Sequence, residues 1–127
     1  MENYRTIVAL AKIKDLRKAG DYAGAYELVK DIAIKRVRDV SDLNMITDVC
    51  TESGDFERSI ESCEKVYKKN GSKHALSSLV YLNIKNKNAE KAREYLEDFE
   101  KKAPKDPTRL IYKYRIEKLE KAPYSDR

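Results

Sequence analysis

The chain contains no tryptophan, one histidine, two cysteines, three prolines and four glycines among its 127 residues. So few glycines and prolines exclude an all-β chain, which needs a tight turn between most pairs of short strands. A single histidine and two well-separated cysteines exclude the usual zinc-ligand patterns, which place ligands in close pairs. The apolar run at residues 7–11 ends at Lys12, too short for a signal peptide or a membrane span. We therefore expect a cytoplasmic protein without membrane contact, metal or other cofactor.

Charged residues make up 39% of the chain and are rich in Glu and Lys, which favour helices, so we predict an all-α fold. The net charge of +5 is uneven: it is +3 over residues 1–40, −3 over residues 41–72 and +5 over residues 73–127. An acidic middle segment interrupts the continuous basic stripe expected of a nucleic-acid binder. This pattern favours a partner of mixed charge or self-association.

A repeat is visible at the turns. Gly20-Asp21-Tyr22 recurs 34 residues later as Gly54-Asp55-Phe56, and a small residue follows five places after each glycine, Ala25 and Ser59. A third polar turn, Asn86-Lys87-Asn88, comes about 33 residues further on, with Ala92 in the small-residue position. A fixed period of this length indicates stacked structural repeats.

Helical periodicity between these turns predicts seven helices. The first covers residues 3–19 with Asn3 as N-cap, and the second covers residues 22–37. The third is capped by Asp39 or Ser41 and ends at Gly54, the fourth lies between Phe56 and Asn70, the fifth is capped by Ser72, the sixth ends at Pro104, and the seventh covers residues 107–121. In the first helix the predicted apolar face consists of Ile7, Leu10, Ala11, Ile13 and Leu16.

Helix-turn-helix units of 34 residues with Gly-Asp-Tyr at the inner turn resemble tetratricopeptide repeats. The resemblance covers residues 6–106 and gives a single domain, residues 1–127, with units at 6–39, 40–72 and 73–106 and an extra helix at 107–121. It implies a right-handed α-solenoid whose concave groove is lined by the first helix of each unit. A generic helical bundle is the alternative.

The resemblance implies a non-catalytic scaffold that binds a protein or peptide, with acidic groups attracted by the basic residues of the groove. Counting along the first helices places a polar, basic and aromatic set on the groove side: Lys14, Arg17, Lys18, Asn44, Asp48, Thr51, Ser77, Tyr81 and Lys85. The same mixture also occurs on any solvated helix face. One rival function is nucleic-acid binding, favoured by Lys101, Lys102 and Lys105 but disfavoured by the acidic second unit. The other rival is a regulatory or docking module of a larger protein.

The seventh helix has two apolar rows, Leu110 with Tyr114, and Tyr112 with Ile116 and Leu119. We expect the second row to need a cover, either a following repeat of a longer protein or a second copy of the chain. His74 is expected at the surface. Cys50 and Cys63 fall on apolar helix faces and are expected to be buried, reduced thiols.

Overall fold

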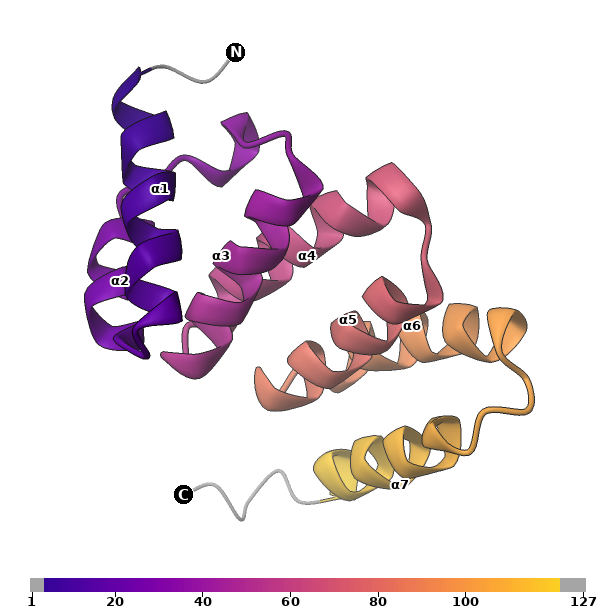
Figure 1. Ribbon diagram of the computed structural model, residues 1–127. Coiled ribbons are helices and arrows are strands. Elements are labelled where there is room, and N and C mark those ends of the chain that lie inside the picture. The colour runs from indigo at the N-terminus through magenta and orange to yellow at the C-terminus, as the bar shows by residue number, and fades with distance from the viewer. Residues whose placement is uncertain (1–3, 122–127) are drawn as a thin grey trace. The chain divides into compact units, whose positions relative to one another are not determined.

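The computed structural model describes residues 4–121, and this range is built of helices and the turns between them (Figure 1). Its seven α-helices and one 3₁₀ helix (η1) confirm the all-α prediction. They are α1 (Tyr4–Lys18), α2 (Tyr22–Val29), η1 (Ile34–Arg36), α3 (Val40–Glu52), α4 (Phe56–Asn70), α5 (Lys73–Lys85), α6 (Ala89–Lys102) and α7 (Thr108–Lys121). No helix within residues 4–121 has both the length and the apolar character to span a bilayer. The Asn3 cap predicted for the first helix lies outside the described residues.

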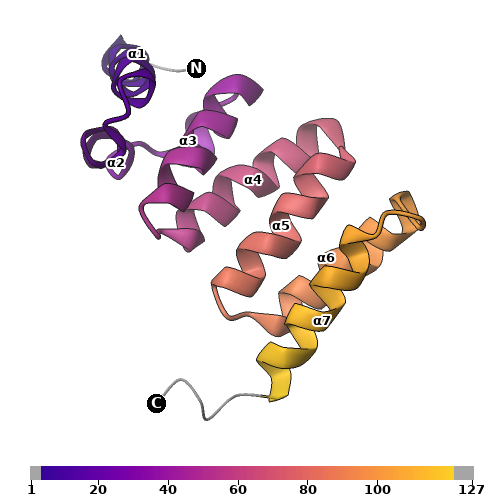
Figure 2. The same ribbon diagram turned by 60° about the horizontal axis from the view of Figure 1, so that its bottom comes forward.

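The chain divides into two compact units between Lys69 and Asn70, close to the predicted repeat boundary at residue 72. Unit 1 contains α1, α2, η1, α3 and all but the last residue of α4. There α1 packs along α2, and both helices contact α3. Unit 2 contains α5, α6 and α7, each of which packs against the other two (Figure 2). Each unit thus has its own set of packed helices.

Three turns between helices share one backbone conformation. A residue with positive φ follows the first helix of each pair: Gly20 at 82°, Gly54 at 80° and Lys87 at 60°. The backbone N–H of the next residue donates to the carbonyl oxygen five residues earlier, which satisfies an acceptor left open at the helix end. These bonds join Asp21 to Leu16, Asp55 to Cys50 and Asn88 to Asn83, at 2.8, 2.9 and 2.9 Å. The turns that recur in the sequence therefore also recur as one backbone conformation in the structure.

The residue after each turn also begins the next helix. Oδ1 of Asp21, Asp55 and Asn88 accepts a hydrogen bond from the backbone N–H three residues later, at 2.8, 3.3 and 3.1 Å. Such a bond satisfies one of the open donors in the first helical turn. Ala25, Ser59 and Ala92 hold the next equivalent position, and all three are fully buried. Full burial leaves little room for a larger side chain at these three positions.

The second helix is shorter than the sequence predicted. α2 ends at Val29, and only η1 follows, whereas the apolar spacing predicted a helix up to Val37. Ile32, Ile34 and Val37 give the reason, because all three are buried. In a continuous helix Ile34 would point about 200° away from Ile32. Breaking the helix lets these β-branched residues, which have modest helix propensity, all become buried.

Two cations of α4 hold the segment that follows α2. Arg58 Nη2 donates to the carbonyl oxygens of Val29 and Ile32, both at 2.7 Å. Lys65 Nζ donates to the carbonyl oxygens of Ile34, Lys35 and Val37 at 3.1, 2.8 and 2.6 Å. The carbonyls of Val29 and Ile34 also accept backbone bonds, from Ile32 and Val37, so the two cations add to the turn bonds of this segment and tie it to α4.

In unit 2, α7 packs through the row that contains Tyr112, Ile116 and Leu119. Ile116 is fully buried, and Leu119 is half-buried. The ring of Tyr112 meets the ring of Phe99 edge-on, with centroids 6.0 Å apart. Helices α5 and α6 therefore already cover much of this row, and its pairing with a following repeat or a second copy stays a prediction.

Polar contacts fix α7 in the same orientation. Ser77 of α5 and the hydroxyl of Tyr112 share a hydrogen bond of 2.7 Å. Arg93 of α6 donates to both carboxylate oxygens of Glu120, from Nε at 3.1 Å and from Nη2 at 2.6 Å. The outward row of α7 is consequently the one that contains Leu110 and Tyr114.

Candidate functional site

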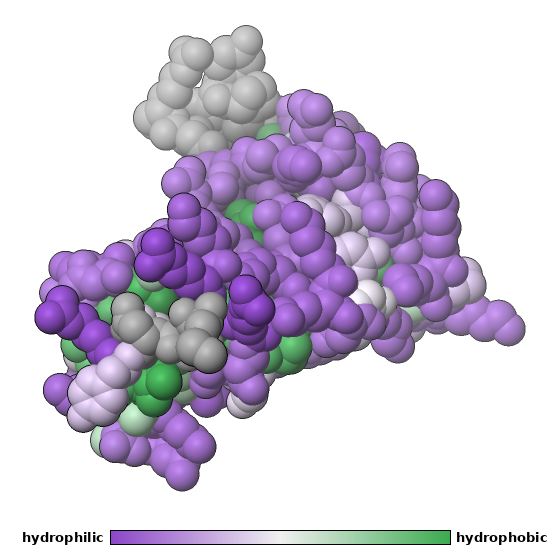
Figure 3. Space-filling view, turned by 90° about the horizontal axis from the view of Figure 1, so that it is seen from above, coloured by the Kyte–Doolittle hydropathy of each residue, from purple (hydrophilic) through white to green (hydrophobic). Residues whose placement is uncertain are grey.

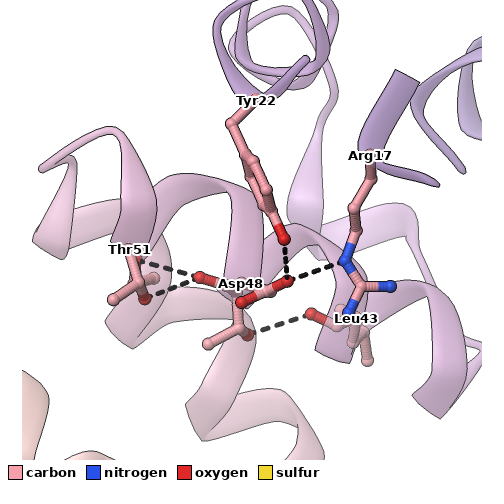
Figure 4. A network of polar contacts seen from close by, with 7 residues as sticks. Arg17, Tyr22, Leu43, Asp48 and Thr51 are labelled. Carbon is pink, nitrogen blue, oxygen red and sulfur yellow. Dashed lines mark hydrogen bonds and ion pairs between the residues drawn. The ribbon is translucent and has the colours of Figure 1, made fainter. Parts of the chain in front are cut away.

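The predicted contact rows of α1 and α3 meet in unit 1. Arg17 Nε donates to Asp48 Oδ2 at 2.7 Å, and the Tyr22 hydroxyl lies 3.4 Å from the same oxygen (Figure 4). The hydrogen bond to Asp48 raises the pKa of Arg17. Both side chains of the pair remain about two-fifths exposed, at 42% and 38%. An ion pair with this much exposure to water contributes under about 1 kcal/mol to stability. Its main effect is to fix the positions of the two charges on the surface.

The uncompensated charge on this surface comes from lysines. Lys14 and Lys18 are exposed on α1, and Asn44 is exposed on α3. Within residues 4–121 neither lysine ammonium forms an ion pair. Helix α1 carries five basic residues against the single acid Asp15, a net charge of +4. Since Asp48 neutralises Arg17, the two lysines are the groups available to an acidic ligand.

Thr51, also predicted as a contact residue, serves the packing of α3 on α4. Its hydroxyl donates to the carbonyl oxygen of Thr47 at 2.7 Å and lies 3.0 Å from Ser59 Oγ. Thr47 Oγ1 and Ser62 Oγ lie 2.6 Å apart in the same interface. Ser62 is fully buried, which the sequence reasoning missed. Its position three residues after Ser59 and next to apolar Cys63 was the available signal.

In unit 2 the predicted residues of α5 are divided between surface and interior contacts. Tyr81 is 40% exposed, and Lys85 Nζ lies 6.0 Å from the centroid of its ring, at the limit of a cation–π contact. Ser77 is instead bonded to Tyr112 of α7. Tyr81 and Lys85 therefore form the part of this row that a partner can reach.

A further apolar surface of α1 was not predicted. Ile7, assigned to the buried face, is 53% exposed, and Tyr4 is 82% exposed. A shallow hollow of about 460 Å³ lies beside them, lined by Tyr4, Arg5, Val8, Ala9, Lys12 and, from α2, Leu28. Figure 3 shows hydrophobic side chains gathered near this end of unit 1, within a largely hydrophilic surface. The period-based prediction failed here because α2 covers only one side of α1.

The two thiols of the chain, Cys50 and Cys63, are poorly suited to act as nucleophiles. Cys50 and Cys63 are both buried as thiols, as predicted. Burial raises the pKa of Cys50 to about 11 and that of Cys63 to about 12. Both therefore stay protonated near neutral pH, whereas the thiolate is the reactive form. His74 is exposed, and no three metal-ligating side chains within residues 4–121 gather around one point.

Comparison with known proteins finds no family model that matches the chain and no matching curated protein. The functional assignment therefore rests on the chemistry of the two units.

Proposed function

We propose that this chain is a non-catalytic, tetratricopeptide-like scaffold that binds a protein or peptide carrying acidic groups. The proposed contact residues lie on the first helix of each helical pair: on α1 and α3 within unit 1, and on α5 within unit 2. The observation that carries the proposal is the solvent-facing surface of unit 1, where Lys14 and Lys18 share α1 with the Arg17–Asp48 pair. The three equivalent turns support the likeness to tetratricopeptide repeats.

Binding would use helices that are already formed, so little conformational entropy is lost when the partner docks. Lys14 and Lys18 attract carboxylates or phosphates, and Asn44 donates and accepts hydrogen bonds. Tyr81 supplies an aromatic face with Lys85 beside it. Thr51 and Ser77 are omitted from the contact set, because their hydroxyls are engaged within the fold.

Catalysis is not part of the proposal. The two thiols are buried and protonated, and the single imidazole lies at the surface. We place the protein in the cytoplasm, where buried thiols remain reduced.

Affinity capture from a native-source lysate tests the proposal. Wild-type protein is immobilised beside a Lys14→Glu/Lys18→Glu/Tyr81→Ala variant. The matched control is Lys102→Glu/Lys105→Glu/Tyr4→Ala, which makes the same charge change and removes one exposed tyrosine elsewhere. Lys18 and Lys102 both lie in the last turn of a helix, so the cost to helix stability is also matched.

We expect a small set of proteins that is retained by wild type and by the control but lost by the first variant. Equal loss in both variants, together with nucleic acid that is released by moderate salt, would instead support the rival function. Retention by all three forms would remove α1, α3 and α5 as the contact surface.

A further inference from the structure

The outward face of α7 carries an apolar stripe. Leu110, Ile111 and Tyr114 are 53%, 51% and 61% exposed. Tyr114 lies four residues after Leu110 and three after Ile111, and both spacings make neighbours on a helix surface, so the three side chains form one patch around Tyr114. The opposite side of α7 is the one that packs on α5 and α6 through Tyr112 and Ile116. The stripe is therefore not required for the packing of unit 2.

Basic side chains surround this stripe. Lys113, Arg115, Lys118 and Lys121 are all exposed on α7, and none of them has an ion-pair partner within residues 4–121. Of the two acids of α7, Glu120 is held by Arg93, so only Glu117 lies among these four cations. The patch thus combines an apolar centre with an excess positive charge of three.

We infer that the outward face of α7 docks an acidic amphipathic helix of another protein. An apolar helix face flanked by Asp and Glu would cover Leu110, Ile111 and Tyr114 and would place carboxylates near Arg115 and Lys118. Apolar contact supplies most of the affinity, and the opposite charges set the orientation. This surface is separate from α1, α3 and α5, so the inference does not depend on the proposed function.

Charge argues against α7 or α1 of a second copy as the occupant. Two α7 faces would bring like charges together, and α7 carries a net charge of +3. The exposed apolar residues of α1, Tyr4 and Ile7, lie on a helix with a net charge of +4, so pairing α7 with α1 of another copy is also opposed. Like-charge contacts of this kind disfavour a wrong partner.

The geometry favours a protein partner over a lipid surface. Nearly half or somewhat less of the surface of each apolar residue in the patch is already covered by the rest of the protein, for Leu110, Ile111 and Tyr114 alike. The patch therefore offers a small apolar area, and membrane binding by an interfacial helix scales with that area. A membrane anchor would bury its apolar face several ångströms into the acyl boundary.

Fluorescence anisotropy with designed peptides tests the inference. The probe is a labelled helical peptide of about 18 residues with leucine at positions i, i+3, i+4 and i+7 along one face and glutamate on both flanks. Two further peptides replace all the glutamates by glutamine or by lysine. We expect affinity for the full chain to fall in the order glutamate, glutamine, lysine.

Three variants locate the contact on the chain. Leu110→Ser/Tyr114→Ser should weaken binding of the glutamate peptide at least tenfold. The control Tyr4→Ser/Ile7→Ser replaces an exposed tyrosine and an exposed aliphatic residue of α1, and it should bind as wild type does. Arg115→Glu/Lys118→Glu should reverse the order and prefer the lysine peptide. Because all these positions are exposed, thermal unfolding monitored by circular dichroism should be unchanged.

Four results would overturn the inference. The first is equal binding of the three peptides, and the second is equal loss in the two serine variants. The third is binding that appears only with vesicles of phosphatidylcholine and phosphatidylserine and is lost in Leu110→Ser/Tyr114→Ser, which would identify a membrane surface. The fourth is reversible dimerisation in sedimentation equilibrium that the same variant abolishes, which would identify a second copy.

Discussion

Replacement of Arg58 by methionine should release the segment between α2 and α3. In the folded chain Arg58 Nη2 donates to the carbonyl oxygens of Val29 and Ile32 at 2.7 Å each. Methionine keeps much of the apolar stem but has no donor. The two carbonyls at the end of α2 then lose their side-chain partner.

The expected cost follows from these two bonds. A hydrogen bond to a charged group is worth roughly 1.5–3 kcal/mol, so two of them set an upper limit of about 6 kcal/mol. The Val29 carbonyl keeps the backbone N–H of Ile32 as a donor at 2.9 Å. Arg58 is only half-buried, so water can reach part of the site and bond the Ile32 carbonyl. In the folded chain Arg58 Nε is buried and has no hydrogen-bond partner within the described residues, which costs stability. The methionine variant avoids this cost, and the gain offsets part of the stability lost with the two hydrogen bonds. We therefore expect a loss of about 3 kcal/mol, half of the upper limit set by the two charged bonds.

Urea denaturation followed by circular dichroism measures this loss, and hydrogen exchange resolved by mass spectrometry locates it. The amides of residues 30–39 should exchange faster in the variant, while those of α5 and α6 should not change. Arg93→Met is the matched control, because Arg93 forms an ion pair with Glu120 in which the side chains are 39% and 40% exposed. Its loss should cost under about 1 kcal/mol.

Equal costs for Arg58→Met and Arg93→Met would contradict this reasoning. Unchanged exchange in residues 30–39 would do the same, because it would mean that the segment is held by the burial of Ile32, Ile34 and Val37 alone.

Three further predictions concern the turns, the small-residue positions and the thiols. Lys87→Gly should raise the free energy of unfolding by about 1 kcal/mol, because Lys87 has a φ of 60°, which is unfavourable for residues other than glycine. A lower urea midpoint in the variant would contradict this prediction. Ala92→Leu should cost roughly 1–3 kcal/mol by overpacking a fully buried site, whereas Ala23→Leu on the exposed side of α2 should be nearly neutral in the same assay. Because burial raises the pKa of Cys50 to about 11 and of Cys63 to about 12, the unfolded chain deprotonates first, and urea stability should fall as pH rises above 9. A Cys50→Ala/Cys63→Ala variant should lose less stability over that range, and an identical pH profile would be the contrary result.

The turns could be predicted from sequence because their chemistry is local. A Gly-Asp pair needs only its own backbone to form the left-handed residue and the N-cap, so Gly20 and Gly54 behave as expected. The third turn was predicted at the right place, but the positive φ of Lys87 was not. A lysine adopts that conformation here because flanking backbone bonds, such as Asn88 to Asn83, define the turn around it.

The early end of α2 could not be predicted, because the residues that stabilise it lie far away in sequence. Arg58 and Lys65 bond carbonyls about 30 positions earlier, and no local pattern marks them as partners of that segment. Likewise, periodicity found both apolar rows of α7 but could not tell which row packs against α5 and α6.

In the candidate site, too, some features follow from the sequence pattern and others depend on packing between distant residues. Arg17 and Asp48 lie on one surface although they are 31 residues apart, three fewer than the repeat period, so the side chains that meet are not equivalent positions of α1 and α3. The period could not show that the hydroxyls of Thr51 and Ser77 turn toward neighbouring helices, because that depends on which side chain faces them. Ser59 faces Thr51 and Tyr112 faces Ser77, and both contacts arise from packing.

A nitrogen-15 NMR titration of the labelled chain with the captured partner would show whether the partner contacts α1, α3 and α5. The account predicts that amide shifts concentrate at residues 14–18 of α1, 44–48 of α3 and 81–85 of α5, and that they vanish in the Lys14→Glu/Lys18→Glu/Tyr81→Ala variant. Shifts confined to residues 101–105 or to α7, with these three segments unchanged, would contradict it.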